Sequence, residues 1–326
     1  MKRRKFITLL GGALAWPLTA RAQQPERMRR IGMLMGYPEA QSEFASFMEA
    51  LRKLGWVDGR NLRIDIRWGI PADPDSMHRF ARELVALQPD LILSQSTPST
   101  AALLQETRII PIVFTIVADP VGSGFVASLA RPGGNATGFV VTESSLGGKW
   151  LELLREVAPR VTRVAALFNP AMAPYAEYWL DSFKAAAASS AVEAIRAPIH
   201  DSSELESVIA AQAREPNSGL FVLPDAFTFA YRVEIVSLAS RYRLPAVYAF
   251  RFFTELGGLL SYGNDLNENF RHAATYADRI LRGEKPSVLP VQAPVKFELV
   301  INLKAATGLG LTVPPTLLGL ADKVIE

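Results

Sequence analysis

The sequence predicts an α/β protein made of two Rossmann-like lobes, each with a parallel sheet covered by helices on both faces. From Arg29 onward, short runs rich in β-branched residues alternate with amphipathic helical patterns. Such alternation is typical of parallel strands joined by right-handed crossover helices. The rhythm restarts after residue 143, and each run is about 120 residues long, which suits two domains in a chain of 326 residues.

The first run opens with a strand at 29–36 and a helix at 43–55. In that helix the apolar residues fall at the i, i+3, i+4, i+7 spacing of one buried face, and Gly55 ends it. The further predicted strands of this run are 61–69, 90–95, 110–117 and 136–140, and the further helices are 75–88 and 98–107. Pro89 stops one helix and Pro98 starts the next.

The second run repeats the same alternation. Its predicted strands are 161–169, 191–199, 219–225, 244–250 and 257–263, and its predicted helices are 146–157, 175–188, 203–214 and 229–242. No residue-level repeat links the two runs, so the sequence indicates similar construction but not a visible duplication.

The tail predicts that the chain crosses between the lobes more than once. A strong helix at 265–283 is followed by a proline-rich link at 284–294 and a further strand and helix. We expect residues 29–143 and about 265–285 to form the first lobe, and residues 144–264 and about 286–326 to form the second. Several crossings make a hinge, and a cleft between two lobes is a preferred ligand location.

The first 22 residues have the features of an export signal. A basic start precedes an apolar stretch from Phe6 to Trp16 and an A-x-A-like cleavage site that ends at Ala22. The pair Arg3-Arg4 before Phe6 resembles a twin-arginine signal, with an ordinary Sec signal as the alternative. No cysteine is available for a lipid anchor, so we expect a soluble periplasmic protein.

Removal of this leader changes the charge balance. The leader holds five of the 35 basic residues and no acid, which leaves 30 basic against 32 acidic residues. The basic isoelectric point of the whole chain therefore comes from the leader, and it predicts no nucleic-acid partner.

The residues needed for common catalytic and metal chemistry are missing. The chain has no cysteine and three histidines, and none of the histidines stands at metal-ligand spacing. The nucleophile-elbow and phosphate-loop motifs are also absent. These absences count against an enzyme, and they predict neither a metal nor a cofactor.

One stretch imitates a dinucleotide-binding fingerprint, because Gly122 to Ala127 reads G-x-G-x-x-A and Glu143 follows. The genuine fingerprint belongs to the first strand–helix turn of its fold, whereas this stretch follows at least three strands. The helix expected near 125–130 is also too short for the crossover of a dinucleotide site. The residue of interest is then Asp119, at the strand end before the glycines.

Polar and aromatic residues stand at the carboxyl ends of the predicted strands, where open α/β sheets bind ligands. The candidate binding residues are Tyr37, Ser96, Thr97, Asp119, Asn169, Asp225, Phe227, Tyr248 and Phe250. Hydroxyls and helix N-termini suit a carboxylate, acids suit an ammonium group, and aromatics suit an apolar body. For the polar residues helix capping is an equal alternative, and for the aromatic residues lobe packing is.

Four long segments resemble the periplasmic solute-binding proteins of ABC transporters, in the branch associated with tryptophan and tyrosine uptake. They are "LGWVDGRNLRIDIRW", "IPIVFTIVADPVGSGFVASLARPGGNATG", "RLPAVYAFRFFTELGGLLSYGNDL" and "KFELVINLKAATGLGLTVPPTLL". The resemblance implies a type I periplasmic binding-protein fold, a small-molecule solute and docking on ABC permease subunits. It also implies a small-hydroxyl turn at Ser96-Thr97, although many relatives carry glycine at Ser96, and binding acids at Asp119 and Asp225.

We expect a monomeric binding protein that holds the solute carboxylate near Ser96 and Thr97 and an amine at Asp119 or Asp225. An aromatic or branched amino acid, another carboxylate and a nucleoside-like compound remain open as ligands. On this view Asp225→Ala weakens binding with little loss of melting temperature. The alternatives are a periplasmic ligand sensor and, further away, a nucleotide-dependent oxidoreductase.

Overall fold

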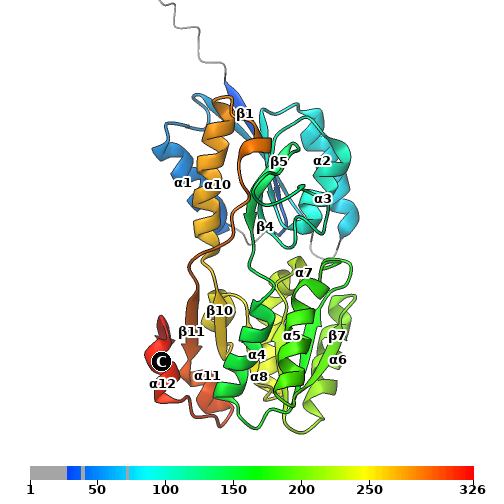
Figure 1. The fold of residues 1–326 in the computed structure, drawn as a ribbon, viewed down its shortest axis with the longest axis vertical. Helices are drawn as coiled ribbons and strands as arrows, with labels where there is room; N and C mark the ends of the chain where they lie inside the picture. Colours follow the sequence, from blue (N-terminus) through cyan, green and yellow to red (C-terminus); the bar gives the residue numbers. More distant parts are fainter. Residues whose placement is uncertain (1–27, 38–40, 71–72) are drawn as a thin grey trace, which may run out of the picture.

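The computed structural model describes residues 28–37, 41–70 and 73–326, and within them it shows two α/β lobes stacked along the long axis of the molecule (Figure 1). The predicted fold class is confirmed, since both sheets are mostly parallel and covered by helices on both faces. The proposed export signal lies outside the described residues.

The first lobe contains a five-stranded sheet in the order β2-β1-β3-β4-β5, and all its pairs are parallel. Its strands are β1 (Arg29–Met35), β2 (Leu62–Trp68), β3 (Leu91–Gln95), β4 (Ile112–Val117) and β5 (Ala136–Val140). Every residue of β3, β4 and β5 is buried, as expected for central parallel strands with helices on both sides.

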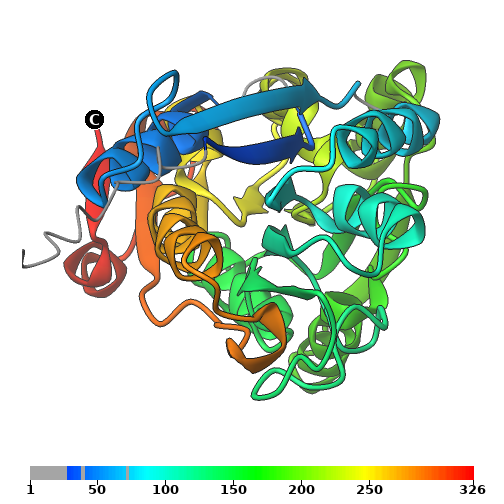
Figure 2. The same ribbon diagram turned by 90° about the horizontal axis from the view of Figure 1, so that it is seen from above.

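Two pairs of helices cover this sheet. They are α1 (Gln41–Lys53) with α10 (Leu266–Leu281), and α2 (Pro74–Ala86) with α3 (Thr97–Glu106). Figure 2 shows the first pair on one side of the strands and the second pair on the other. Side chains of β1 alternate between the two resulting cores, since Met33 and Met35 belong to one and Leu34 to the other.

The second lobe contains a seven-stranded sheet in the order β12-β11-β10-β9-β8-β6-β7. Its strands are β6 (Arg163–Phe168), β7 (Glu193–Pro198), β8 (Ser218–Val222), β9 (Ala246–Tyr248), β10 (Leu260–Gly263), β11 (Glu298–Asn302) and β12 (Lys323–Ile325). Only the β10–β11 pair is antiparallel, because β11 enters the sheet after the chain has returned from the first lobe.

Its helices are α4 (Leu146–Val157), α5 (Glu177–Ser189), α6 (Leu205–Ala213), α7 (Ala226–Ala230), α8 (Arg232–Arg241), α9 (Arg251–Glu255), α11 (Leu303–Gly308) and α12 (Pro315–Leu320). The helix expected at 229–242 is therefore two helices, α7 and α8, which meet at Tyr231. Short 3₁₀ turns, η1 (Ser202–Glu204) and η2 (Pro286–Val288), complete the described elements.

The chain passes between the lobes after β5, after β10 and again before β11. The expected start of the last second-lobe segment, at about 286, is wrong for residues 286–292. This stretch lies along β5, where Thr137 donates a hydrogen bond of 2.6 Å to the carbonyl of Leu289 and Gln292 exchanges backbone bonds with Gly138 and Val140. The open edge of β5 offers unpaired backbone groups, and this segment satisfies them.

Candidate functional site

The two lobes share one strand order, and this places a crevice at equivalent points in each. Read in each lobe's own sequence order, both parallel sections run 2-1-3-4-5. In such sheets the connections diverge between the first and third strands, and ligands bind at the carboxyl ends there. In the first lobe Tyr37 and Ser96 follow the two strands, and in the second lobe Asn169 and Asp225 do.

A pocket of about 580 Å³ lies between the lobes next to these strand ends. Its volume is within the range of roughly 300–1,000 Å³ of small-molecule sites. The first lobe contributes Met77, His78, Thr97, Pro98, Ala101, Gln105, Asp119, Gly122, Ser123 and Phe125, and the second contributes Ala171, Pro174, Tyr175, Glu177 and Tyr178. Of the nine predicted binding residues, the pocket brings together Thr97 and Asp119.

The first-lobe wall is fixed by side-chain bonds to the backbone. The hydroxyl of Thr97 accepts a hydrogen bond of 3.0 Å from the amide of Ala118, which ties the start of α3 to the end of β4. Asp119 Oδ1 accepts a bond of 2.8 Å from the amide of Gly122. A Cβ atom at Gly122 would lie 1.9 Å from Asp119 Oδ2, so the aspartate holds this position only because residue 122 is glycine.

The second-lobe wall includes two tyrosines, Tyr175 in the turn just before α5 and Tyr178 in its first turn. The Tyr175 phenol faces the first lobe in the lining that it shares with Thr97, and burial raises its pKa, with a further contribution from the negative charge of Asp225. The Tyr178 hydroxyl lies 3.5 Å from the carbonyl of Thr142, to which it donates. Burial raises the pKa of Tyr178, with a further contribution from the negative charge of Asp119. Both phenols therefore stay protonated.

Ser96 is the N-cap of α3 in a conformation that suits glycine. Its hydroxyl accepts a hydrogen bond of 3.4 Å from the amide of Ser99 and pairs with the Ser99 hydroxyl at 3.0 Å. Its dihedral angles are φ 92° and ψ 156°, close to a region that is essentially reserved for glycine. Ser96 is 6% exposed and lies against Gly36, so its hydroxyl supports the turn beside the pocket.

Asn169 and Asp225 are buried and hold the ends of β6 and β8 together. Asp225 Oδ2 accepts a bond of 3.1 Å from the amide of Asn169, and Oδ1 accepts a bond of 2.8 Å from the amide of Thr228. Asn169 caps the following turn through the amide of Met172 and donates to the carbonyl of His200. Burial raises the pKa of Asp225 to about 7, against the opposing effect of these amides.

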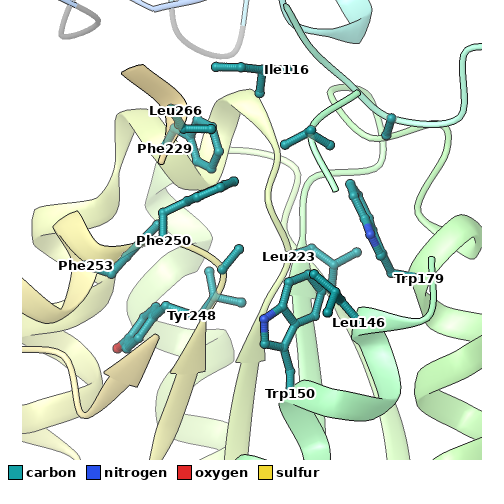
Figure 3. Close-up of a cluster of buried hydrophobic side chains, with 14 of the residues drawn as sticks. Ile116, Leu146, Trp150, Trp179, Leu223, Phe229, Tyr248, Phe250, Phe253 and Leu266 are labelled. Atoms are coloured by element: carbon teal, nitrogen blue, oxygen red, sulfur yellow. The ribbon is translucent and has the colours of Figure 1, made fainter. Parts of the chain in front are cut away.

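The predicted aromatic residues are buried, three of them in the second lobe and Tyr37 in the first. Figure 3 shows Tyr248 and Phe250 in a buried cluster with Phe229, and Phe227 is also fully buried. Tyr37 reaches across from the first lobe, with its ring centroid 5.4 Å from that of Phe229 in an edge-on arrangement. The structure thus places Phe227, Tyr248 and Phe250 in the packing of the second lobe, which Tyr37 meets from the first lobe, and none of the four lines the pocket.

Ile116 enters the same cluster from above through an irregularity in β4. The register between β4 and β5 shifts between Phe114 and Val117, and Ile116 takes a φ of 55°. Such bulges redirect a side chain, and for a β-branched residue this conformation is strained. Together with Ser96 and Asp119 (φ 38°), Ile116 makes the ends of β3 and β4 a strained region that faces the second lobe.

The glycine pattern at 122–127 does not open a helix. Residues 120–124 form turns and residues 125–135 are irregular, so the helix expected near 125–130 is wrong. The amides of Phe125 and Val126 bond back to the carbonyl of Pro120 instead of starting a helical ladder.

Sequence reasoning missed the residues that form much of the pocket wall, namely Tyr175, Tyr178, Phe125, Gln105 and His78. The sequence predicts a helix from Tyr175, and a spacing of three residues puts Tyr175 and Tyr178 on one face of it. In the structure Tyr175 lies in the turn just before α5. That pattern was a usable signal.

Within the described residues no group of three His, Asp or Glu side chains is placed to hold a metal ion. None of the helices in this part of the chain is both long and apolar enough to cross a membrane.

Comparison with known proteins assigns the family. The model of the ABC transporter substrate-binding protein family matches residues 33–325, which is nearly the whole described chain. The chain belongs to this family. A curated relative, the tyrosine-binding protein of Clostridioides difficile, is 28% identical over 273 residues, which are 83% of this chain and 77% of the relative.

Solved structures share the fold of this chain. A conserved domain protein from Vibrio cholerae superposes with a TM-score of 0.85 at 28% identity, over 91% of this chain and all of the other. An ABC domain from Streptococcus pneumoniae in complex with L-tryptophan gives a TM-score of 0.84 at 24% identity, over 91% and 99% of the two chains. These similarities confirm the two-lobed fold of a substrate-binding protein.

Proposed function

We propose that this chain captures an aromatic amino acid between its lobes and delivers it to the permease of an ABC importer. The observation that carries the proposal is the pocket between the lobes, with Tyr175, Tyr178 and Phe125 in its walls and the carboxylate of Asp119 at its edge. The tyrosine-binding relative and the neighbour solved with L-tryptophan support the same ligand class.

The pocket offers partners for both charged groups of an amino acid. Asp119 supplies a carboxylate for the ammonium group. The ten-residue helix α3 starts at the pocket with Thr97, and its first amides and partial positive charge suit the ligand carboxylate. The rings of Tyr175 and Tyr178 add aromatic area, and their phenol oxygens can accept hydrogen bonds. A micromolar dissociation constant needs only about 8 kcal/mol, which a few such contacts supply.

The other predicted residues have a supporting role in this proposal. Ser96 shapes the start of α3, and Asn169 with Asp225 fixes the strand ends below α5. Tyr37 packs on Phe229 across the lobe boundary, and Phe227, Tyr248 and Phe250 belong to the buried packing of the second lobe. Substitutions at these positions change binding through the shape of the walls.

Calorimetry tests the proposal. Purified protein is titrated with L-tyrosine, L-tryptophan and L-alanine, and we expect the two aromatic amino acids to bind with micromolar or tighter affinity and L-alanine to bind far more weakly. Asp119→Asn removes a charge-assisted hydrogen bond of about 1.5–3 kcal/mol, so affinity falls roughly tenfold to a hundredfold. The matched control is Asp181→Asn, an exposed carboxylate of α5 outside the pocket lining. Absence of binding by both aromatic amino acids rejects the proposal.

Export and transport complete the proposed role. Substrate-binding proteins of ABC transporters work outside the cytoplasm, and we propose that residues 1–22 export this chain to the periplasm as a soluble monomer. Cell fractionation should find a shortened chain in the periplasmic fraction. A strain without the protein should lose uptake of the labelled amino acid. Unchanged uptake with a lost cellular response to the amino acid would favour a sensor instead.

A further inference from the structure

The end of the first lobe that points away from the second lobe, here called the outer pole, carries unpaired basic side chains. Thr97 and Asp119, which follow the carboxyl ends of β3 and β4, line the interlobe pocket, and all strands of this sheet are parallel. The loops that lead into the strands therefore form the outer pole, where β1 begins and α10 ends (Figure 1). Arg60, Arg108 and Lys285 are exposed in these loops, and none of them forms an ion pair within the described residues.

The acids of the outer pole are mostly neutralised by other bases. The ion pairs there are Arg29–Asp90, Arg82–Glu106, Arg279–Glu284 and Arg282–Asp278, with N···O separations between 2.6 and 3.9 Å. Asp58 is exposed, and its Oδ1 accepts a hydrogen bond of 3.1 Å from the amide of Ile64. In the described loops of this pole the three unpaired bases thus stand against Asp58 alone, so the outer pole is positively charged.

Large apolar side chains are exposed among these bases. Ile109, which follows Arg108, is 82% exposed, and Val288, three residues after Lys285, is 62% exposed. Bases near helix C-termini compensate the helix dipole, but exposed aliphatic side chains do not serve that purpose. Segments that lie on a membrane surface combine Lys and Arg with exposed apolar side chains in this way.

The two apolar side chains belong to one surface. The side-chain amide of Asn135 donates a hydrogen bond of 2.8 Å to the carbonyl of Ile110, in the loop before β4. Two residues earlier, the backbone amide of Gly133 donates one of 3.4 Å to the carbonyl of Ser287, in η2. The short stretch before β5 therefore lies between the two loops and joins them.

A cavity of about 550 Å³ opens at the same pole. Its lining includes Arg29, Arg60 and Arg282, together with the half-buried Trp56, and it contains no acid. The guanidinium carbon of Arg282 lies 5.8 Å from the centroid of the Trp56 ring. Guanidinium groups bind phosphate, and tryptophan is enriched at the headgroup level of membranes. The cavity is therefore suited in size and charge to a phosphodiester headgroup.

The chain enters the fold at the outer pole. Met28, the first described residue, lies directly before β1 and is 49% exposed. The segment that we propose as an export signal is thus joined to the fold at this pole. Export signals act at a membrane, so the outer pole is the part of the fold that is attached to one during export.

We propose that the outer pole docks reversibly on the anionic lipid headgroups of a membrane surface. Each unpaired base strengthens the attraction to anionic headgroups about fivefold, and Ile109 and Val288 enter the apolar boundary below them. The interlobe pocket lies at the opposite end of this lobe, so it stays accessible to solute while the protein is docked. Docking keeps the protein at the membrane between rounds of solute capture, whichever solute it binds.

Vesicle flotation tests the proposal. Processed protein purified from the periplasm is mixed with vesicles of phosphatidylethanolamine and phosphatidylglycerol, and with vesicles in which phosphatidylcholine replaces the phosphatidylglycerol. We expect the protein to float with the anionic vesicles and to stay in solution with the neutral ones. High salt should release it, because salt screens the attraction between exposed charges.

Two sets of substitutions separate the charged and the apolar contributions. The triple variant Arg60→Gln, Arg108→Gln and Lys285→Gln should lower the partition onto anionic vesicles roughly a hundredfold. The double variant Ile109→Ser and Val288→Ser leaves the charge unchanged and should lower it about tenfold. All five side chains are exposed, so the melting temperature and the affinity for the amino acid should stay at their wild-type values.

The matched control makes the same change of charge at the far end of the second lobe. Arg160, Arg214 and Arg243 are exposed in the loops before β6, β8 and β9, and they too form no ion pair within the part of the chain that the structure describes. Their triple replacement by Gln should leave the partition close to that of the wild-type protein.

Three results overturn the proposal. They are an equal loss of binding in the two triple variants, equal flotation with anionic and neutral vesicles, and flotation only with vesicles that also contain the permease. The first assigns the attraction to total charge, the second removes the anionic headgroup, and the third makes the outer pole a protein contact. None of them affects the proposed function, which fails instead when no aromatic amino acid binds.

Discussion

The carboxyl ends of the strands in the two lobes look alike in sequence but do different work in the structure. In the first lobe Thr97 and Asp119 bond nearby amides and still line the pocket. In the second lobe Asn169 and Asp225 bond each other's strand ends and are almost fully buried. Polar residues after a strand thus line the pocket in the first lobe, whereas in the second lobe they form buried hydrogen bonds that hold two strand ends together.

The difference follows from how many amides each acid must satisfy. Asp119 accepts from one amide in an exposed turn and keeps Oδ2 beside the pocket. Asp225 uses both oxygens on buried amides, as the cap of α7 and as the link to β6. A side chain whose hydrogen-bonding capacity is already used by the backbone holds the fold, and one with capacity left at a cavity can hold a ligand.

The largest effect should come from removing the Asp225 carboxylate, which links the ends of β6 and β8 in the second lobe. Asp225→Ala leaves the buried amides of Asn169 and Thr228 without acceptors, and we expect a loss of about 2–4 kcal/mol of unfolding free energy. Chemical denaturation of the unliganded protein measures it. This replaces the expectation from sequence that Asp225→Ala would spare the melting temperature. An unchanged stability together with weakened binding would return Asp225 to the ligand site.

The next effect should separate ligand binding from stability in the first lobe. Gly122→Ala puts a methyl group where Asp119 Oδ2 now lies, so the carboxylate must move and ligand affinity should fall about tenfold or more. The unliganded melting temperature should change little, because the turn is exposed. Gly134→Ala is the matched control, since a Cβ atom there meets nothing within 4 Å. Equal effects of the two variants on affinity would contradict a role for Asp119.

The smallest effect should come from relieving backbone strain at Ser96, the N-cap of α3. Ser96→Gly relieves a backbone conformation that suits glycine, and a glycine N-cap is only a few tenths of a kcal/mol worse than serine, so unfolding free energy should rise by about 1 kcal/mol. Ser96→Ala keeps the strain and loses the cap, and it should destabilise the protein. Thermal denaturation of both variants measures the signs. A glycine variant that is less stable than the alanine variant would contradict the strain.

The sequence was sufficient to predict the fold class, because the spacing of apolar residues along the chain reflects directly which side chains are buried. The alternation of apolar strands and amphipathic helices predicted both sheets, and the long helix now called α10 packs with α1 in the first lobe. The sequence was insufficient to place residues 286–292. A proline-rich stretch without apolar periodicity gives no sign that it forms hydrogen bonds with the unpaired backbone edge of β5.

The candidate site was predictable only in part. Strand ends pointed to Thr97 and Asp119, but strand ends also attract caps, and composition alone does not separate Asp119 from Asp225. Tyr175 lies just before α5 and Tyr178 in its first turn, and only the packing of the lobes brings them opposite α3. A contact between segments about eighty residues apart leaves no local pattern in the sequence.

Residues 286–292, which lie along β5, also determine the order in which the two lobes can complete their folding during synthesis. The first lobe needs α10 and residues 286–292 for its outer face and its last edge, although its strands end at residue 140. During synthesis it therefore stays unfinished until the entire parallel section of the second lobe has been made. The lobe that is made first is completed last, so a chain truncated before residue 292 should expose the edge of β5 to aggregation.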